Sequence, residues 1–496
     1  MLKKYKKAVI IFCGIIGLII VLYYSYSIIF HVNISPSAKL PLCNHCNVIL
    51  ISLDTLGSNH LPCYGYDRNT AQNLCDFAQK NVLFTKSYSN APWTLPSHFS
   101  IFTSLYPKHH GVENFYKDTL DASVVTLPQI LQKNDYDTIY IGPTDNPSLP
   151  LDKGLGKGFS EIIKYLDIDT WQIGYESLIK NNREGKSTFL FLHTYWVHAP
   201  YFIGDLGGEK TKRLYTDKYY PQIPITYSQM YNSFSSGLYD YILHSQAMDE
   251  FVTDRKTLSQ LKNSKNFSQA EKIFNSLSSS DQYVLRYNYY SYLLQENPDI
   301  SAYAIDLYDE LIYYLDQRLV TLFNLLKTPS IANNTIVIIT SDHGEEFMEH
   351  GSINHPEDHI FNSTTATPLI MYIPGISNKK INNMVQSIDL LPTILGITGI
   401  NKPSGIDGID LTDMISGKER AAHNDYLISQ GKNIDSIRDQ RWKLYVHYNG
   451  LSNRDLNLYD LENDPDETHN FGINEKAKII KDLESVLELT IYKRPL

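Results

Sequence analysis

Four residues of this chain have the types and positions expected of a metal site that cleaves esters. Asp54 follows one apolar, strand-like run, and Asp342 and His343 follow another. Between them in the sequence, Thr94 stands in a short turn with a proline on either side. Carboxylates, an imidazole and a hydroxyl group can together hold a divalent ion against a nucleophile. The pattern therefore predicts metal-assisted ester cleavage with Thr94 as the attacking group.

Each of these acidic residues also has a simpler interpretation. A carboxylate at the end of a buried strand is costly unless it binds a metal or is hydrogen-bonded, but Asp54 could instead cap a helix. Asp342 and His343 could be local caps of a turn. We favour metal ligands for all three. A second metal would need another Asp/His pair, and no histidine lies at suitable spacing around Asp306 and Asp309, so we expect one ion.

Histidines supply the candidate proton donors and anion contacts. His198 follows a strand-like run closely, and an imidazole titrates near neutrality as a leaving-group donor must. His98, one helical turn after the candidate nucleophile, could contact the nucleophile or the transferring group, or merely pack. His350, His355 and His359 form a cluster after the second acidic pair. Within it we choose His355 first and His359 second.

Several segments of the chain occur in the order found in one enzyme family. They are Ile51-Ser52-Leu53-Asp54-Thr55, Thr94-Leu95-Pro96-Ser97-His98, Thr103-Ser104-Leu105-Tyr106-Pro107, His110-Gly111, His198-Ala199-Pro200-Tyr201, Ser341-Asp342-His343-Gly344, Arg441-Trp442-Lys443-Leu444 and Leu458-Tyr459-Asp460-Leu461. Together they resemble the sulfatase family of the alkaline phosphatase superfamily, over nearly all of residues 45–472 apart from 201–300. The resemblance implies one divalent ion (Mn, Zn, Ca or Mg) held by Asp54, Thr94, Asp342 and His343.

Three positions depart from the pattern of that family. Thr55 stands where many sulfatases carry a second Asp, so one ligand is missing or replaced by water. His98 replaces the usual Arg. Thr94 stands at the position of the Cys or Ser that becomes formylglycine, and Thr cannot give that aldehyde. We expect Thr94 to attack directly as a hydroxyl group activated by the metal.

A threonine nucleophile bears on the substrate. Water or an alcohol can resolve a phosphothreonine, whereas a sulfated threonine lacks the elimination route of the hydrated aldehyde. The chemistry therefore leans towards phosphate esters, and the family resemblance leans towards sulfate esters. Phosphodiester cleavage, or transfer of a phospho-alcohol unit such as phosphoethanolamine or phosphoglycerol, is the alternative. A non-catalytic binding protein with the same fold is a third and weaker possibility.

The apolar runs predict the fold. Residues 47–53, 138–142, 189–193 and 335–340 have the composition of buried strands. An amphipathic pattern from Tyr308 to Leu326 predicts a long helix. Strands that alternate with helices indicate an α/β, alkaline-phosphatase-like, mostly parallel sheet sandwiched by helices. Ligands of such sheets lie beyond the carboxyl ends of the strands, where the candidate site residues fall.

The rest of the catalytic domain, placed at residues 46–375, is less regular. Residues 201–300 form an insertion with helices at 269–277 and 281–296, which either covers the site mouth or decorates the periphery. Residues 76–81 are the end of a helix, with Val82 on its apolar side. We expect a smaller α+β subdomain at 376–496, in which residues 387–395 begin a helix and residues 436–445 form an edge strand followed by a hairpin.

The N-terminal region predicts a membrane anchor. Residues 1–7 contain four lysines, and residues 8–30 carry no charge; about 20 apolar residues suffice to span a bilayer. The lysines should stay cytoplasmic, so residues 31–45 form a linker to an extracytoplasmic enzyme. A cleaved signal peptide is the alternative. The tether favours an envelope glycan or lipid head group as the anionic substrate.

The net charge bears on the partners of the protein, and the cysteines bear on its location. The net charge of −10 argues against nucleic acid as a partner. Outside the cytosol, Cys43, Cys46, Cys63 and Cys75 allow up to two disulfides. Their spacing makes a zinc site less favoured, and the sequence leaves the pairing open.

Overall fold

The structure is a computed structural model. It describes residues 43–114, 117–144, 149–165, 168–199, 201, 215, 234–245, 252–296, 298–418, 421–450, 453–472 and 476–493.

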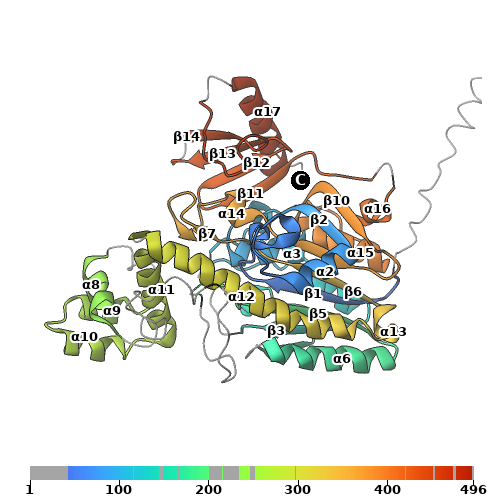
Figure 1. Ribbon diagram of the computed structural model, residues 1–496, viewed down its shortest axis with the longest axis horizontal. Helices are drawn as coiled ribbons and strands as arrows, with labels where there is room; N and C mark the ends of the chain where they lie inside the picture. The colour runs from blue at the N-terminus through green and yellow to red at the C-terminus, as the bar shows by residue number, and fades with distance from the viewer. Residues whose placement is uncertain are drawn as a thin grey trace, which may run out of the picture. The chain divides into compact units, whose positions relative to one another are not determined.

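An eight-stranded mixed sheet forms the centre of the molecule (Figure 1). Its order is β10-β2-β9-β6-β1-β5-β3-β4, and all neighbours are parallel except that β9 runs antiparallel to β2 and β6. The strands are β1 (Asn47–Leu53), β2 (Val82–Tyr88), β3 (Tyr136–Gly142), β4 (Glu161–Lys164), β5 (Ser187–Thr194), β6 (Thr335–Thr340), β9 (Leu369–Tyr372) and β10 (Lys379–Gln386). The expected mostly parallel sheet is present, and β1, β3, β5 and β6 are its four predicted strands.

Helices cover both faces of this sheet, because alternate residues of the buried strands point to opposite sides. One apolar core lies between the sheet and α3 (Thr94–Thr103), α5 (Leu127–Lys133) and α15 (Leu390–Thr398). The other lies against α2 (Gln72–Lys80), α6 (Trp171–Arg183) and the long α12 (Pro298–Leu325). Figure 1 shows α6 and α12 on the same side of the sheet.

Shorter elements connect these layers. They are α4 (Pro107–His110), α13 (Pro329–Ala332), α14 (Asn362–Thr365), α16 (Thr412–Ser416), the two-stranded sheet of β7 (Glu346–Phe347) and β8 (Ile353–Asn354), and 3-10 turns at Ser58–His60, Pro62–Tyr64, Leu151–Lys153, Ile168–Thr170 and Ser387–Asp389.

The insertion is helical in its described part. Helices α8 (Ser236–His244), α9 (Arg255–Lys262), α10 (Phe267–Phe274) and α11 (Ser279–Glu296) pack around an apolar cluster of their own. Residues 202–214 and 216–233 lie outside the described residues, so the expectation that the insertion covers the site mouth stays a prediction.

The C-terminal part is the expected α+β unit, built differently from the prediction in two respects. Its antiparallel sheet, β11 (Leu427–Gly431), β12 (Ile434–Arg438), β13 (Trp442–Tyr448) and β14 (Arg454–Asp460), packs against α17 (Ala477–Leu487), which a π-helical turn at Glu488–Tyr492 follows. Residues 436–445 are not one edge strand, because a turn divides them between the two inner strands β12 and β13. The boundary proposed at 375/376 also falls inside the main sheet, since β10 follows it.

One further prediction was wrong at Val82. The helix ends at Lys80, and Val82 begins β2 beside β9 and β10. Sheet pairing with distant strands therefore overrides the local helical periodicity.

Two disulfides join Cys43 to Cys46 and Cys63 to Cys75. Within the described part of the chain, none of the helices is both long and apolar enough to cross a bilayer. The proposed anchor at residues 8–30 lies outside that part.

Candidate active site and metal centre

The predicted site residues meet at the carboxyl edge of the central sheet. Strand β1 pairs in parallel with both β5 and β6, and Ser52 lies opposite His193 on one side and Thr340 on the other. The chain segments that leave these strands therefore emerge together, which brings Asp54 beside Asp342. Helix α3 begins with Thr94 at the same edge.

Short distances connect the four proposed ligands. The Thr94 hydroxyl oxygen lies 3.4 Å from Asp54 Oδ2 and 3.3 Å from His343 Nε2. The same Nε2 lies 3.4 Å from Asp342 Oδ2 and 3.8 Å from Asp54 Oδ1. All four side chains are buried. One ligand atom from each of Asp54, Asp342 and His343 falls within 4.8 Å of the other two, close enough to share an ion.

The hydrogen bonds leave the atoms that face this centre available. Asp342 Oδ1 accepts from the backbone N–H groups of Thr55 and His343, while its Oδ2 has no hydrogen-bond partner among the described residues. Asp54 Oδ2 accepts from His193, and its Oδ1 is likewise without a partner in the described chain. His343 Nδ1–H donates to the Gly344 carbonyl, so Nε2 keeps its lone pair. Buried carboxylate oxygens without partners are costly and fit a bound cation.

The pKa shifts of the proposed ligands also favour a bound cation. Burial raises the pKa of Asp54, and the neighbouring Asp342 raises it further. Burial also opposes ionisation of Asp342, but the surrounding imidazoles, led by His343, outweigh it and lower the pKa of Asp342. Burial lowers the pKa of His343, which favours the neutral ligand form. Two buried carboxylates this close ionise together only beside a positive charge.

Thr94 is not a helix cap. The N-cap position of α3 belongs to Trp93, which makes no side-chain capping bond, and Thr94 is the first helical residue. Its hydroxyl group points to Asp54 and His343 instead. The positive end of a helix stabilises negative charge on an oxygen at this position.

Thr55 does not replace the acidic residue expected there. Its hydroxyl group donates to the carbonyl of Val197, 3.2 Å away. Its backbone N–H supports Asp342.

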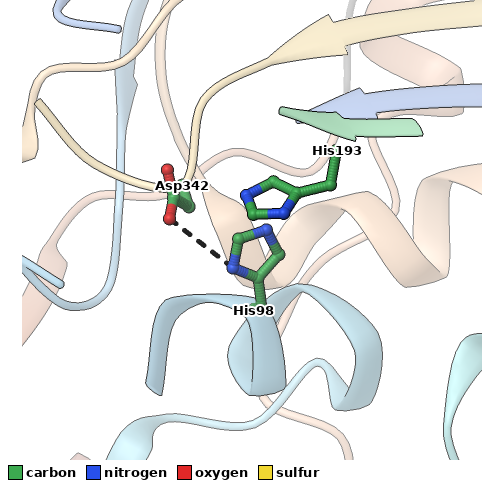
Figure 2. Close-up of side chains that lie close together, drawn as sticks. All are labelled: His98, His193 and Asp342. Carbon is green, nitrogen blue, oxygen red and sulfur yellow. Dashed lines mark ion pairs between the residues drawn. The ribbon is translucent and has the colours of Figure 1, made fainter. Parts of the chain in front are cut away.

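His98 is fully buried and contacts the backbone of Thr94. Its Nδ1–H donates to the Thr94 carbonyl over 2.9 Å, and its Nε2 lies 3.0 Å from Ser52 Oγ. Figure 2 shows His98 and His193 facing one another beside Asp342. Of the three roles considered for His98, contact with Thr94 is the one its placement fits, and its Nδ1 also lies 3.5 Å from Asp342 Oδ2.

His198 and His355 stand together on the outer side of the metal centre. Their ring centroids lie 5.0 Å apart, and the His355 ring lies 4.4 Å from that of His343. His198 Nδ1–H donates to the Ala199 carbonyl, and His355 Nδ1 lies 2.8 Å from Glu345 Oε1. Burial lowers the pKa of both imidazoles to about 4 and raises the pKa of Glu345 to about 7.

The second choice, His359, belongs to a different contact network. Its Nδ1 bonds Glu346 at 2.8 Å, and its ring lies against Phe361. The His350 ring stacks on the same phenyl group. The structure therefore brings His355, and not His359, to the predicted site.

Two residues of the site were missed by sequence reasoning. His193 was recognised only as the end of a strand, although it stands on the same face as Ser52 and Asp54, and this alternation was a usable signal. Glu345 follows His343 by two residues, but its bond to His355 spans ten residues and has no periodic signature.

Comparisons with known protein families agree with this geometry. The family model described as Sulfatase matches residues 46–400, and the model described as N-sulphoglucosamine sulphohydrolase, C-terminal, matches residues 348–493.

Two relatives show how far the likeness extends. The chain is 22% identical over 481 residues to the Delta 4,5-hexuronate-2-O-sulfatase of Bacteroides thetaiotaomicron, with 89% of this chain and 88% of that protein covered. It is 24% identical over 424 residues to Arylsulfatase K of Homo sapiens, covering 79% and 73%.

Solved structures share the fold. One, in complex with its substrate D-glucosamine-2-N,6-O-disulfate, matches with a TM-score of 0.59 at 20% identity and covers 90% of this chain and 97% of its own. The phosphonate monoester hydrolase of Silicibacter pomeroyi matches with a TM-score of 0.59 at 17% identity, covering 90% and 95%.

Proposed function

The chain belongs to the sulfatase family, and we propose that it is a membrane-anchored, metal-dependent hydrolase that cleaves a sulfate or phosphate ester with Thr94 itself as nucleophile. Its family makes it a sulfuric ester hydrolase by class. The nucleophile, the particular ester and the anchor are the proposed elements. One observation carries the proposal. Asp54 Oδ1 and Asp342 Oδ2, which lack hydrogen-bond partners among the described residues, lie 3.8 and 3.4 Å from His343 Nε2, and that nitrogen lies 3.3 Å from the Thr94 hydroxyl oxygen.

The residues suggest a two-step reaction. Asp54, Asp342 and His343 would hold one divalent ion, which when bound supplies Lewis-acid stabilisation and favours ionisation of the Thr94 hydroxyl. Asp54 Oδ2 accepts the hydrogen bond of that hydroxyl group. A new bond forms from Thr94 Oγ1 to sulfur or phosphorus as the bond to the departing alcohol oxygen breaks. Water then cleaves the Thr94 ester, releases the inorganic anion and restores Thr94.

His198 and His355 would contact the departing group. In the cationic form, each imidazole would donate from Nε2 to the ester oxygens, stabilise developing charge and protonate the alcohol. Burial lowers the pKa of both rings to about 4, so this form needs the negative charge of the bound ester beside it. This reaction does not require an aldehyde at residue 94.

A second candidate is phosphodiester cleavage or transfer of a phospho-alcohol unit. The threonine favours it, because a phosphothreonine is resolved by water or by an acceptor alcohol. The same fold also carries a phosphonate monoester hydrolase.

An envelope glycan or lipid head group is the proposed substrate class. Relatives include sulfatases named for hexuronate and N-acetylglucosamine esters. Anchoring through residues 8–30 would keep the enzyme at the extracytoplasmic membrane surface, and two disulfides are consistent with export.

The test is turnover of paired aryl sulfate, phosphate monoester and phosphodiester substrates by the full-length chain in detergent, with Mn²⁺, Zn²⁺, Mg²⁺ or Ca²⁺. Thr94→Ala is compared with Thr103→Ala, a buried threonine at the other end of α3 whose hydroxyl group bonds Phe99.

The results of these assays distinguish the two candidate functions. Sulfate release that needs Thr94 would support a sulfatase without formylglycine. Phosphodiester cleavage that needs Thr94, with sulfate inert, would support the second candidate. Turnover that survives Thr94→Ala would contradict both. No turnover of any of the three would contradict hydrolysis of simple esters and leave transfer to a specific acceptor or a binding role.

A further inference from the structure

A second group of potential metal ligands lies directly behind the first. It consists of His98, His193 and Asp342, all fully buried, and shares Asp342 with the metal centre (Figure 2). Three of its four ring nitrogens have hydrogen-bond partners, and His193 Nδ1 has none among the described residues. His98 Nδ1–H donates to the Thr94 carbonyl, which can only accept, and His193 Nε2–H donates to Asp54 Oδ2 at 3.0 Å. His98 Nδ1 and His193 Nε2 carry the hydrogens of these bonds and cannot serve as metal ligands, which favours a supporting role for the group.

We propose that His193 is the positioning residue for Asp54, and that it sets the metal affinity of the centre by holding Oδ2 so that Oδ1 faces the ion. The inference rests on the proposed function, because it needs Asp54 to be a ligand. His193 would touch neither the ion nor the substrate.

The two carboxylate ligands differ in how they are held. Asp342 Oδ1 is fixed by two backbone N–H groups, which no side-chain substitution removes. Among the described residues, Asp54 Oδ2 has hydrogen-bond contacts with His193 at 3.0 Å and, more weakly, with Thr94 at 3.4 Å. The orientation of Asp54 therefore depends on a single imidazole donor.

The strand register explains why a histidine can fill this role. His193 pairs with Ser52 near the end of β1, and Asp54 directly follows that strand, two residues after Ser52. The His193 ring also packs edge-on against the His98 ring, with centroids 4.7 Å apart. This contact restricts the ring to one orientation, and the hydrogen bond from Nε2 then restricts Asp54. Partners that orient metal ligands in this way typically contribute about 10- to 100-fold in metal affinity.

The test compares two amides that differ in reach. His193→Gln places its NH₂ group near the position of Nε2, whereas the shorter His193→Asn reaches only the position of Nδ1. Mn²⁺ is titrated calorimetrically into the chelator-treated full-length chain in detergent, and each metal-free variant is melted in parallel. His110→Asn is the control for a buried polar histidine, because His110 bonds Ser100 and the Pro96 carbonyl, away from the centre.

We expect Asn to weaken Mn²⁺ binding about 10- to 100-fold, and Gln to restore affinity to within a few-fold of wild type. His110→Asn should lower the melting temperature without changing affinity. Equal affinity of wild type and His193→Asn, or equal losses for Asn and Gln, would overturn the positioning role while leaving the proposed function intact. Absence of Mn²⁺ binding by the wild type would instead overturn the proposed metal centre, and this inference with it.

Discussion

Two regions of this protein bury charged side chains, and they differ in how many of these charges have partners within the described chain. In the C-terminal unit, Lys443 and Glu467 are almost fully buried and form an ion pair at 2.9 Å. Lys443 also donates to the Ile360 carbonyl, and Glu467 accepts from Tyr445 and from the backbone of Asn362. Each charge there is matched by a partner of this chain.

The site at the sheet edge is buried as deeply but is left incomplete. Asp54 and Asp342 each keep one oxygen without a partner among the described residues. The difference teaches how to separate structural from functional buried charge. A buried ion pair whose hydrogen bonds are satisfied indicates a structural role, whereas buried carboxylate oxygens without partners that converge on one point indicate a cation-binding site.

The largest effect should come from the nucleophile. Thr94→Ala removes the attacking oxygen, and we expect turnover to fall by about 10³- to 10⁶-fold, with Thr94→Ser keeping measurable activity. Initial rates at saturating metal measure this. Lys443→Met, assayed below its melting temperature, should keep near wild-type rates; a rate loss as large as that of Thr94→Ala would erase the contrast between the two regions.

Breaking the satisfied pair should have the largest effect on stability. Lys443→Met leaves Glu467 buried without its cation, and we expect a loss of about 3–5 kcal/mol in the free energy of unfolding. Urea denaturation measures it. A change near zero would show that this cluster is no more structural than the site.

The hydrogen bond between His355 and Glu345 should affect the rate of catalysis. Glu345 and Glu346 hold His355 and His359 with bonds of equal length, 2.8 Å, but only His355 adjoins the metal centre. We expect Glu345→Gln to lower kcat by up to about 10²-fold through misplacement of His355, with Mn²⁺ affinity unchanged.

Glu346→Gln is the matched control for this substitution. It should leave kcat near that of the wild type. Equal effects of the two variants would remove the distinction between the two histidines.

Removing the repulsion between the Asp54 and Asp342 carboxylates should slightly stabilise the metal-free protein. Asp54→Asn removes repulsion with Asp342 while an amide oxygen can still accept from His193, so we expect a gain of about 0.5–2 kcal/mol. Chelator-treated urea unfolding tests this, and Mn²⁺ should stabilise the wild type but not the variant. Destabilisation as great as that of Lys443→Met would mean that Asp54 is structural.

Sequence reasoning recovered the parts of the fold that carry a local signal. Buried parallel strands are continuous apolar runs, so β1, β3, β5 and β6 could be predicted, and the ends of β1 and β6 led directly to Asp54 and Asp342. Strand β10 was missed because its first five residues, Lys379-Lys380-Ile381-Asn382-Asn383, are mostly polar and a register shift after Ile381 breaks the period of two. Val82 was misplaced because its partners lie almost three hundred residues away.

The candidate site could be predicted from the sequence to about the same extent as the fold. The residues proposed to bind the ion and the substrate belong to short, ordered segments, so Thr94, His198 and His343 could be named from sequence. The residues that hold them could not, because His193 and Glu345 have a role only through a hydrogen bond formed in the folded chain. The choice between His355 and His359 likewise needed the packing of the rings.

The number of divalent ions bound per chain tests the central claim most directly. Calorimetric titration of Mn²⁺ into the chelator-treated full-length protein, beside Asp54→Asn and His343→Ala, counts them. We expect one ion per chain in the wild type and a severe loss of binding in both variants. No binding by the wild type, or two ions of which one disappears in His98→Ala, would contradict a single metal centre built from Asp54, Thr94, Asp342 and His343.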